Sequence, residues 1–185
     1  FTIGFEKEDT KMLHEYWDEI IAAQMWTEGK FTKMFEEKWL EYNQLPSVAF
    51  ASWGGAALAA QEFFAVRGQT VLCPSNTFMA TPLSIIKAGG NVEFVDCNKD
   101  DLCLSLADLK LKVEIYKPKA VWIVHIGGHI AFQIEEIAAF CKKKGIILLE
   151  DCAHAHGASW KGRKAGTWGD AGIYSFYATK TITTG

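Results

Sequence analysis

The stretch Ile-Ile-Leu-Leu-Glu-Asp at residues 146–151 decides the fold of this chain. Four apolar residues in a row predict a buried β-strand, and two acidic residues mark its end. Three lysines and a glycine at residues 142–145 precede it, and they predict the end of a helix, since cations favour the last turn and glycine favours the stop. A helix that leads into a wholly apolar strand is typical of a parallel sheet covered on both faces.

The same alternation of short apolar strands and helices extends from about residue 47 to residue 177. Strands are expected at residues 47–52, 70–73, 92–96, 120–125, 146–151 and 172–176. Helices are expected near residues 56–66, 79–88, 105–114 and 132–144, after two earlier helices at 8–26 and 31–42. The pattern predicts an α/β fold with a mostly parallel sheet and helices on both faces.

Composition excludes several classes of protein. The 185 residues are 49% apolar and 13% aromatic, which indicates a globular chain, and the net charge of −3 argues against a nucleic-acid partner or an anionic membrane surface. No apolar run approaches the roughly 20 residues of a membrane span, and residues 1–30 lack a secretory signal core. The five cysteines form no Cys-x-x-Cys pair, so we expect reduced thiols in a cytoplasmic protein without a metal site.

Ligands of such sheets bind outside the carboxyl ends of the strands, where Asp151 is expected. A buried carboxylate needs a partner, which could be a helix cap or a cationic ring nitrogen such as a protonated pyridine. Asp151 could also bind a metal together with His154 and His156, but their spacing does not match a standard site.

Other strand ends offer further candidates. The turn before Gly55 and Ala56 could hold a phosphate on backbone amides or simply turn the chain, and it lacks the glycine and lysine patterns of NAD and ATP sites. Phe78 belongs either to the core or to a stack on a planar ligand. Lys180, just past the last strand, is either a surface lysine or a buried lysine of the site, and Ser175 offers a hydroxyl for a phosphate oxygen.

In this order and spacing, the chain resembles the DegT/DnrJ/EryC1/StrS family of sugar aminotransferases, which are fold-type-I pyridoxal phosphate enzymes. The similarity runs from about residue 26 to the end of the chain. It includes residues 35–37, 52–58, 74–81, 94–96, 150–158, 161–163, 169–171 and 175–180. The resemblance implies that residues 31–185 form the cofactor-binding large domain and residues 1–30 an N-terminal helical segment. It also implies that the C-terminal small domain is absent, because family members are much longer.

The resemblance implies a role for each matching residue. Lys180 binds the cofactor aldehyde as a Schiff base and moves a proton, and Asp151 keeps the pyridine nitrogen protonated. Phe78 stacks on one face of the ring, and Ala153 and His154 surround the other. The backbone of Gly55 and Ala56 and the hydroxyl of Ser175 bind the phosphate. The expected cofactor-binding residues are thus Gly55, Ala56, Phe78, Asp151, His154, Ser175 and Lys180.

The implied reaction moves an amino group from a donor, in this family usually glutamate, to a keto sugar linked to a nucleotide diphosphate. Such enzymes serve amino- and deoxysugar synthesis, and the family implies a homodimer with shared active sites. Lysine at position 180 separates the aminotransferases from relatives that carry histidine there and dehydrate the sugar. The chain departs from the family at Gly55, usually threonine, at Ala178, usually proline, and at Thr181, usually asparagine.

Two alternatives stay open at this point. The chain could be a truncated, non-catalytic remnant or regulatory module that binds the cofactor, or an aminotransferase for a cyclic ketone that is not a sugar. In either reading the 185-residue fragment alone is expected to be inactive, since much of the substrate pocket would lie beyond it.

Overall fold

The chain falls into two compact units in a computed structural model that describes residues 4–184. The first unit ends at Ala49 and consists of two helices, α1 (Lys7–Ala23) and α2 (Lys30–Asn43). Both helices were expected from the sequence. The second unit, here called the sheet unit, begins at Phe50 and contains every strand of the described chain. The expected boundary of the cofactor-binding domain at residue 31 stays a prediction.

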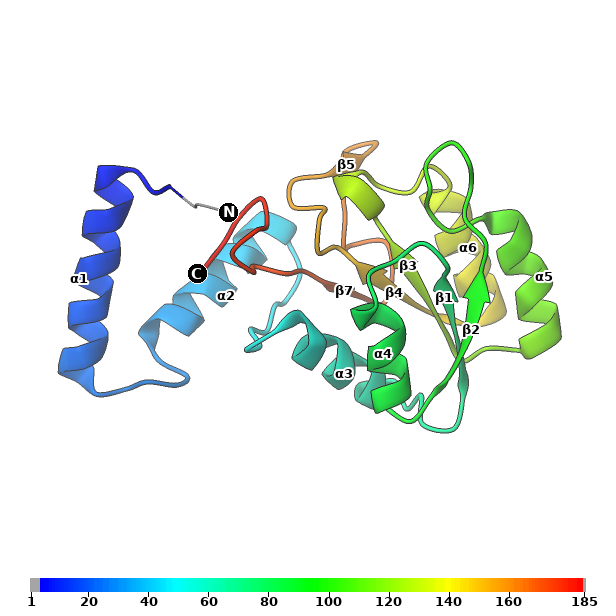
Figure 1. The fold of residues 1–185 in the computed structure, drawn as a ribbon, viewed down its shortest axis with the longest axis horizontal. Coiled ribbons are helices and arrows are strands. Elements are labelled where there is room, and N and C mark those ends of the chain that lie inside the picture. The colour runs from blue at the N-terminus through cyan, green and yellow to red at the C-terminus, as the bar shows by residue number, and fades with distance from the viewer. Residues whose placement is uncertain (1–3, 185) are drawn as a thin grey trace. The chain divides into compact units, whose positions relative to one another are not determined.

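The sheet unit is built on a five-stranded parallel sheet in the order β2-β1-β3-β4-β7 (Figure 1). Its strands are β1 (Thr70–Pro74), β2 (Asn91–Val95), β3 (Ala120–Val124), β4 (Ile147–Asp151) and β7 (Ala171–Ile173). Its helices are α3 (Trp53–Phe63), α4 (Ala80–Lys87), α5 (Leu106–Tyr116) and α6 (Ile134–Lys144). The predicted α/β class is therefore confirmed, and so is the helix stop at Gly145, whose φ of 68° lies in the left-handed region.

Each face of the sheet has its own core, because successive side chains of a strand point to opposite sides. Leu148 belongs to the cluster that includes α5 and α6, and Leu149 belongs to the cluster that includes α3 and α4. The alternation continues to the end of β4. Glu150 therefore lies on the α5–α6 side of the sheet and Asp151 on the α3–α4 side.

The strand expected at residues 47–52 is wrong. Its apolar residues are open to solvent, with Val48 73% and Phe50 49% exposed, so they do not belong to a buried sheet. The amide of Ala49 donates to the carboxylate of Glu36 (2.8 Å) instead of to a neighbouring strand. The strand expected at residues 172–176 is shorter, and it ends at Ile173.

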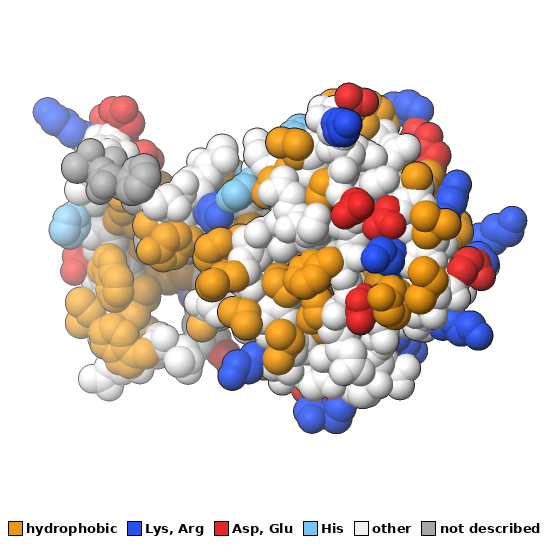
Figure 2. All heavy atoms as spheres, turned by 45° about the vertical axis from the view of Figure 1, so that its right-hand side comes forward, with side chains coloured by type: hydrophobic (Ala, Val, Ile, Leu, Met, Phe, Trp, Pro, Cys, Tyr) orange, Lys and Arg blue, Asp and Glu red, His pale blue; other side chains and the backbone are white. Residues whose placement is uncertain are grey.

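Three small elements were not predicted. They are a 3₁₀ turn, η1 (Ile126–Gly128), and an antiparallel hairpin of β5 (Ser159–Trp160) and β6 (Arg163–Lys164). Hydrophobic side chains also lie on the surface between charged ones, as Figure 2 shows. Within residues 4–184, no helix has both the length and the apolar character that a membrane crossing requires.

Candidate functional site

Asp151, the last residue of β4, is a buried carboxylate with only 6% of its surface exposed. Its Oδ2 accepts a hydrogen bond from the Thr81 hydroxyl (2.9 Å), and its Oδ1 accepts one from the amide of Ala153 (3.0 Å). Burial raises the pKa of Asp151, while these two hydrogen bonds and the nearby imidazoles of His154 and His125 lower it. The carboxylate thus retains a demand for a positively charged partner.

Lys180 and His154 lie together on the wall of a pocket of about 280 Å³, with Gly127, Thr179 and Thr181. Lys180 is half-buried, whereas a buried lysine was one of the two expectations from the sequence. Its amide donates to the carbonyl of Tyr177 (2.8 Å), which turns the chain just after the last strand. The turn places the lysine side chain beside the residues that follow β4.

His156 has a hydrogen bond with the Ser175 backbone and lies within electrostatic range of Lys180, and the sequence indicated it only as a metal ligand. Burial lowers the pKa of His156, a hydrogen bond with the Ser175 backbone raises it, and the charges of Lys180 and His154 lower it. Its ring also contacts Phe176, with 5.1 Å between ring centroids. Ser175 itself is buried, and its hydroxyl oxygen accepts the amide of Tyr177 (3.4 Å). The position of His156 two residues beyond His154 was the signal available in the sequence.

Gly55 and Ala56 lie in the first turn of α3, as expected, but both amides have partners within the chain. The amide of Gly55 donates to the hydroxyl oxygen of Ser52, the N-cap residue (3.1 Å), and the amide of Ala56 donates to the Ser52 carbonyl (3.1 Å). A phosphate bound at Gly55 would have to replace the Ser52 hydroxyl. The cap thus competes with an anion for the same donor.

Phe78 precedes α4 and is 72% exposed, so the expectation that it belongs to the core is wrong. The helix that follows it carries Thr81, the residue bonded to Asp151. The aromatic ring and the hydroxyl therefore come from one short stretch of chain. An exposed ring at this position is available to a planar ligand, although the stacking itself stays a prediction.

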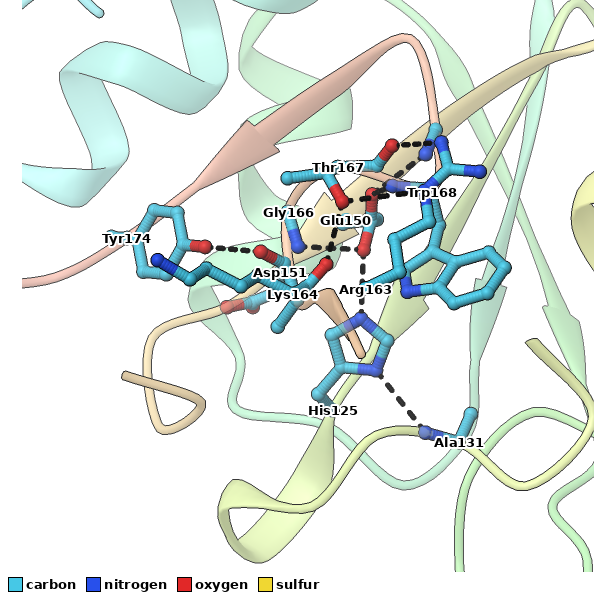
Figure 3. A network of polar contacts seen from close by, with 12 residues as sticks. His125, Ala131, Glu150, Asp151, Arg163, Lys164, Gly166, Thr167, Trp168 and Tyr174 are labelled. Atoms are coloured by element: carbon cyan, nitrogen blue, oxygen red, sulfur yellow. Dashed lines mark hydrogen bonds and ion pairs between the residues drawn. The ribbon is translucent and has the colours of Figure 1, made fainter. Parts of the chain in front are cut away.

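Glu150 forms a hydrogen-bond centre on the opposite side of β4 that sequence reasoning missed. One carboxylate oxygen accepts the amides of Trp168 and Gly169 (both 2.6 Å), and the other accepts the Gly166 amide (2.8 Å) and pairs with His125 Nε2 (3.0 Å). Figure 3 shows Gly166, Trp168 and His125 around the carboxylate of Glu150. The amide of Ala131 donates to His125 Nδ1 (3.3 Å), so Nε2 carries the proton given to Glu150.

In the described part of the chain, one group of side chains has the proximity of a metal site, namely His125, Glu150 and Cys152. It does not fit a metal. Both oxygens of Glu150 already accept two hydrogen bonds each, and burial raises the pKa of Cys152 far above its usual value, so the thiolate that a metal prefers is disfavoured. The set Asp151, His154 and His156 is not among the groups with suitable proximity in this part of the chain.

The residues around Asp151 do fit pyridoxal phosphate. A protonated pyridine nitrogen is a cationic hydrogen-bond donor, which is the partner that a buried carboxylate with a raised pKa calls for. Lys180 supplies a primary amine, and its neighbour in the pocket, His154, acts electrostatically on Asp151. His154 thus lines the pocket with the Lys180 amine and lies within electrostatic range of the Asp151 carboxylate.

Comparison with known proteins gives a consistent picture. Residues 7–185 match the model of the DegT/DnrJ/EryC1/StrS aminotransferase family. GDP-perosamine synthase of Escherichia coli O157:H7 is 34% identical over 161 residues, which cover 86% of this chain and 44% of that protein. UDP-4-amino-4,6-dideoxy-N-acetyl-beta-L-altrosamine transaminase of Campylobacter jejuni is 33% identical over 169 residues, which cover 89% of this chain and 44% of that protein.

A solved structure shows the same fold. The aminotransferase of Helicobacter pylori that takes part in the biosynthesis of pseudoaminic acid superposes with a TM-score of 0.86 at 26% identity. The superposition covers 97% of this chain and 48% of that one. The chain thus spans slightly less than half the length of these relatives.

Proposed function

The chain belongs to the DegT/DnrJ/EryC1/StrS aminotransferase family, and we propose that it binds pyridoxal phosphate for the transfer of an amino group to a keto sugar on a nucleotide diphosphate. The observation that carries this proposal is the buried carboxylate of Asp151, which accepts hydrogen bonds from the Thr81 hydroxyl and the Ala153 amide. Three residues further along the chain, His154 lines a pocket together with Lys180. The relatives named for GDP- and UDP-linked sugars support the substrate class.

When bound, pyridoxal phosphate supplies an aldehyde that takes up amino groups and a ring that accepts electrons. Asp151 holds the proton on the ring nitrogen, because an ionised carboxylate in a buried place favours a charged partner. Lys180 would hold the cofactor through Nζ, and the same nitrogen, as a free amine, would move a proton. His154 lines the pocket beside Lys180 and bounds the space for the ring.

The phosphate end is assigned to Ser175 and to the first turn of α3. The Ser175 hydroxyl accepts the Tyr177 amide and is therefore oriented to donate its proton to an anion. The Gly55 amide adds a donor once the Ser52 hydroxyl moves away from it, and the Ala56 amide, which donates to the Ser52 carbonyl, adds a donor where it shares that bond with the phosphate. Phe78, exposed ahead of α4, covers one face of the ring.

The remaining parts of the proposal concern the whole protein. The amino donor is glutamate, the protein is a cytoplasmic homodimer with shared active sites, and the product enters amino-sugar or polysaccharide synthesis. These assignments rest on the family and not on contacts within this chain. The specific sugar, the nucleotide and the carbon that is aminated are left open.

Cofactor attachment tests the proposal most directly. The protein as its gene encodes it is incubated with pyridoxal phosphate, reduced with borohydride and digested, and the peptides are analysed by mass spectrometry. We expect a phosphopyridoxyl group on Lys180, which forms only where the amine and the aldehyde are joined. Lys180→Ala should lose both the label and the visible absorbance of the bound cofactor.

Lys161→Ala is the matched control, because Lys161 is an exposed lysine paired with Glu135. It should keep the label on Lys180. Label spread over surface lysines, with none on Lys180, contradicts the proposed cofactor role. A labelled protein that releases no 2-oxoglutarate from glutamate, and none of the corresponding keto acid from other amino acids, favours a non-catalytic cofactor-binding module instead. Reading the coding sequence beyond Gly185 shows whether the family pattern continues.

A further inference from the structure

We propose that Thr81 is a positioning residue for Asp151, and that its hydroxyl holds the carboxylate ionised and oriented toward a cationic ring nitrogen. This inference rests on the proposed cofactor role of Asp151. Thr81 is completely buried, and it is fixed in the first turn of α4 (Ala80–Lys87). A donor on a helix keeps its place more firmly than a donor on a loop, so the carboxylate has a rigid support.

The Thr81 hydroxyl is the middle member of a hydrogen-bond network that runs from the Thr77 hydroxyl to the Asp151 carboxylate. Thr81 Oγ1 lies 2.9 Å from Asp151 Oδ2 and 2.8 Å from Thr77 Oγ1. A hydroxyl has one proton to give. When Asp151 is ionised, Thr81 donates to it, and Thr77 must therefore donate to Thr81. Two hydroxyl dipoles then point at the carboxylate, which strengthens its interaction with the nearer one.

The donors and acceptors of this hydrogen-bond network can also be reversed. A protonated Asp151 can donate to Thr81, which then donates to Thr77, and Thr77 donates to the carbonyl of Phe78 at 3.3 Å. This end contact is longer than the 2.8 and 2.9 Å contacts of the network, and the acceptor is neutral. The arrangement lets Asp151 gain or lose a proton without leaving a buried hydroxyl unpaired, and it favours the ionised form.

Other groups around Asp151 supply less of this support. Cys73 on β1 and Cys152 after β4 are buried thiols whose pKa values are raised, Cys73 to about 12, so both stay neutral. The imidazoles of His125 and His154 lower the pKa of Asp151 less than the hydrogen bonds from Ala153 and Thr81 do. Of the two stronger groups, only Thr81 acts through a side chain. Its hydroxyl can therefore be removed without changing the backbone.

The test measures the affinity for pyridoxal phosphate as a function of pH, in Thr81→Val and Thr81→Ser. Valine keeps the shape and loses the hydroxyl, so we expect affinity at neutral pH to fall about tenfold or more, as for the loss of a hydrogen bond to a charged group. Without the hydroxyl, the pKa of Asp151 rises further. The acid side of the binding profile, where protonation of Asp151 weakens binding, should therefore move to higher pH. Serine keeps the hydroxyl and should restore the wild-type profile.

Ser84→Ala is the matched control. Ser84 is a buried hydroxyl of the same helix that donates to the Thr81 carbonyl (2.7 Å) and accepts from Gln61, and it is not one of the hydrogen-bond donors to Asp151. It should leave the pH profile in place even if it lowers stability. An unchanged profile in a folded Thr81→Val overturns the inference. If that variant does not fold, Thr77→Val decides, because loss of the first donor should move the profile in the same direction by less, and no movement overturns the inference as well.

The two proposals fail in different ways. If the wild-type protein binds no pyridoxal phosphate at any pH, the proposed function falls, and the role of Thr81 falls with it. If the wild type binds and Thr81→Val binds identically, only the role of Thr81 falls.

Discussion

Glu150 and Asp151 are neighbouring carboxylates at the end of one strand, yet their surroundings differ sharply. Glu150 is completely buried, and four donors saturate its oxygens. Asp151, on the other face of the sheet, has two donors and a pKa that burial raises. Burial of a carboxylate is offset where hydrogen bonds satisfy every lone pair and remains unfavourable where they do not. Glu150 is therefore fully satisfied within the chain, whereas Asp151 can accept a further hydrogen bond, as its proposed cofactor role requires.

The difference supports the proposed site on the α3–α4 side of the sheet. The four donors to Glu150 come from the loop at residues 166–169 and from His125, so this carboxylate ties the segment before β7 to the end of β3. The ties stabilise the scaffold on the α5–α6 side. On the α3–α4 side, Asp151 retains an unsatisfied demand for positive charge. Such a local conflict is expected at functional or strained sites.

The largest effect is expected for Glu150→Gln. The amide nitrogen of glutamine would face two donors whichever way the side chain turns, because each oxygen of Glu150 accepts two hydrogen bonds. We expect the free energy of unfolding to fall by about 3 kcal/mol, measured by urea denaturation. Glu114→Gln, at an exposed carboxylate bonded to Lys144, is the control and should change stability little. A fully stable Glu150→Gln would contradict the structural role of the carboxylate.

A smaller loss is expected for His125→Phe. Phenylalanine keeps a ring in the core but removes the acceptor for the Ala131 amide and the donor to Glu150. Because the Ala131 amide is then left unsatisfied, we expect a loss of about 2 kcal/mol in the same urea experiment. The effects of His125→Phe and Glu150→Gln should not add, since the two residues share one bond. His154→Phe, at an exposed imidazole, should leave unfolding unchanged.

The sequence predicted that Asp151 is a buried carboxylate at the end of a strand, which the structure confirms, whereas its cofactor role stays a prediction, and the sequence analysis missed Glu150. Asp151 is visible because acidic residues rarely end a buried strand, and the resemblance gave it a role. Glu150 is invisible because three of its four partners are backbone amides, which any residue type can supply. The pattern of apolar residues predicted the strands of the parallel sheet correctly but predicted a strand at residues 47–52 that does not form. It reports which residues can be buried and not whether a neighbouring strand is present to cover them.

Asp151→Asn should raise the free energy of unfolding, whereas the two substitutions above should lower it. Asparagine removes the buried charge and retains an oxygen and an amide for local hydrogen bonds, so the protein without cofactor should gain about 1 kcal/mol of stability. Cofactor binding should be lost at the same time. Asp101→Asn is the matched control, because Asp101 is a buried carboxylate whose two oxygens accept the amides of Cys103 and Phe132 (3.0 and 2.8 Å). Asp101→Asn should lose stability. A gain in stability in Asp101→Asn would mean that the gain in Asp151→Asn is not specific to Asp151.

The smallest effect is the pH dependence of the gain in Asp151→Asn. The pKa of Asp151 is raised in the folded chain, so above the ordinary value of 3.8 the folded state holds a proton that the unfolded state has released. The contribution of Asp151 to stability is therefore complete at acid pH and is lost as the pH rises through the raised pKa.

His156, whose pKa is lowered, acts in the opposite sense, because its contribution is lost as the pH falls below 6.5. The two proteins share His156, so the difference between their unfolding free energies isolates Asp151. That difference should be near zero in acid and should grow toward neutral pH. A constant difference would mean that the gain comes from shape or hydrogen bonding and not from the buried charge.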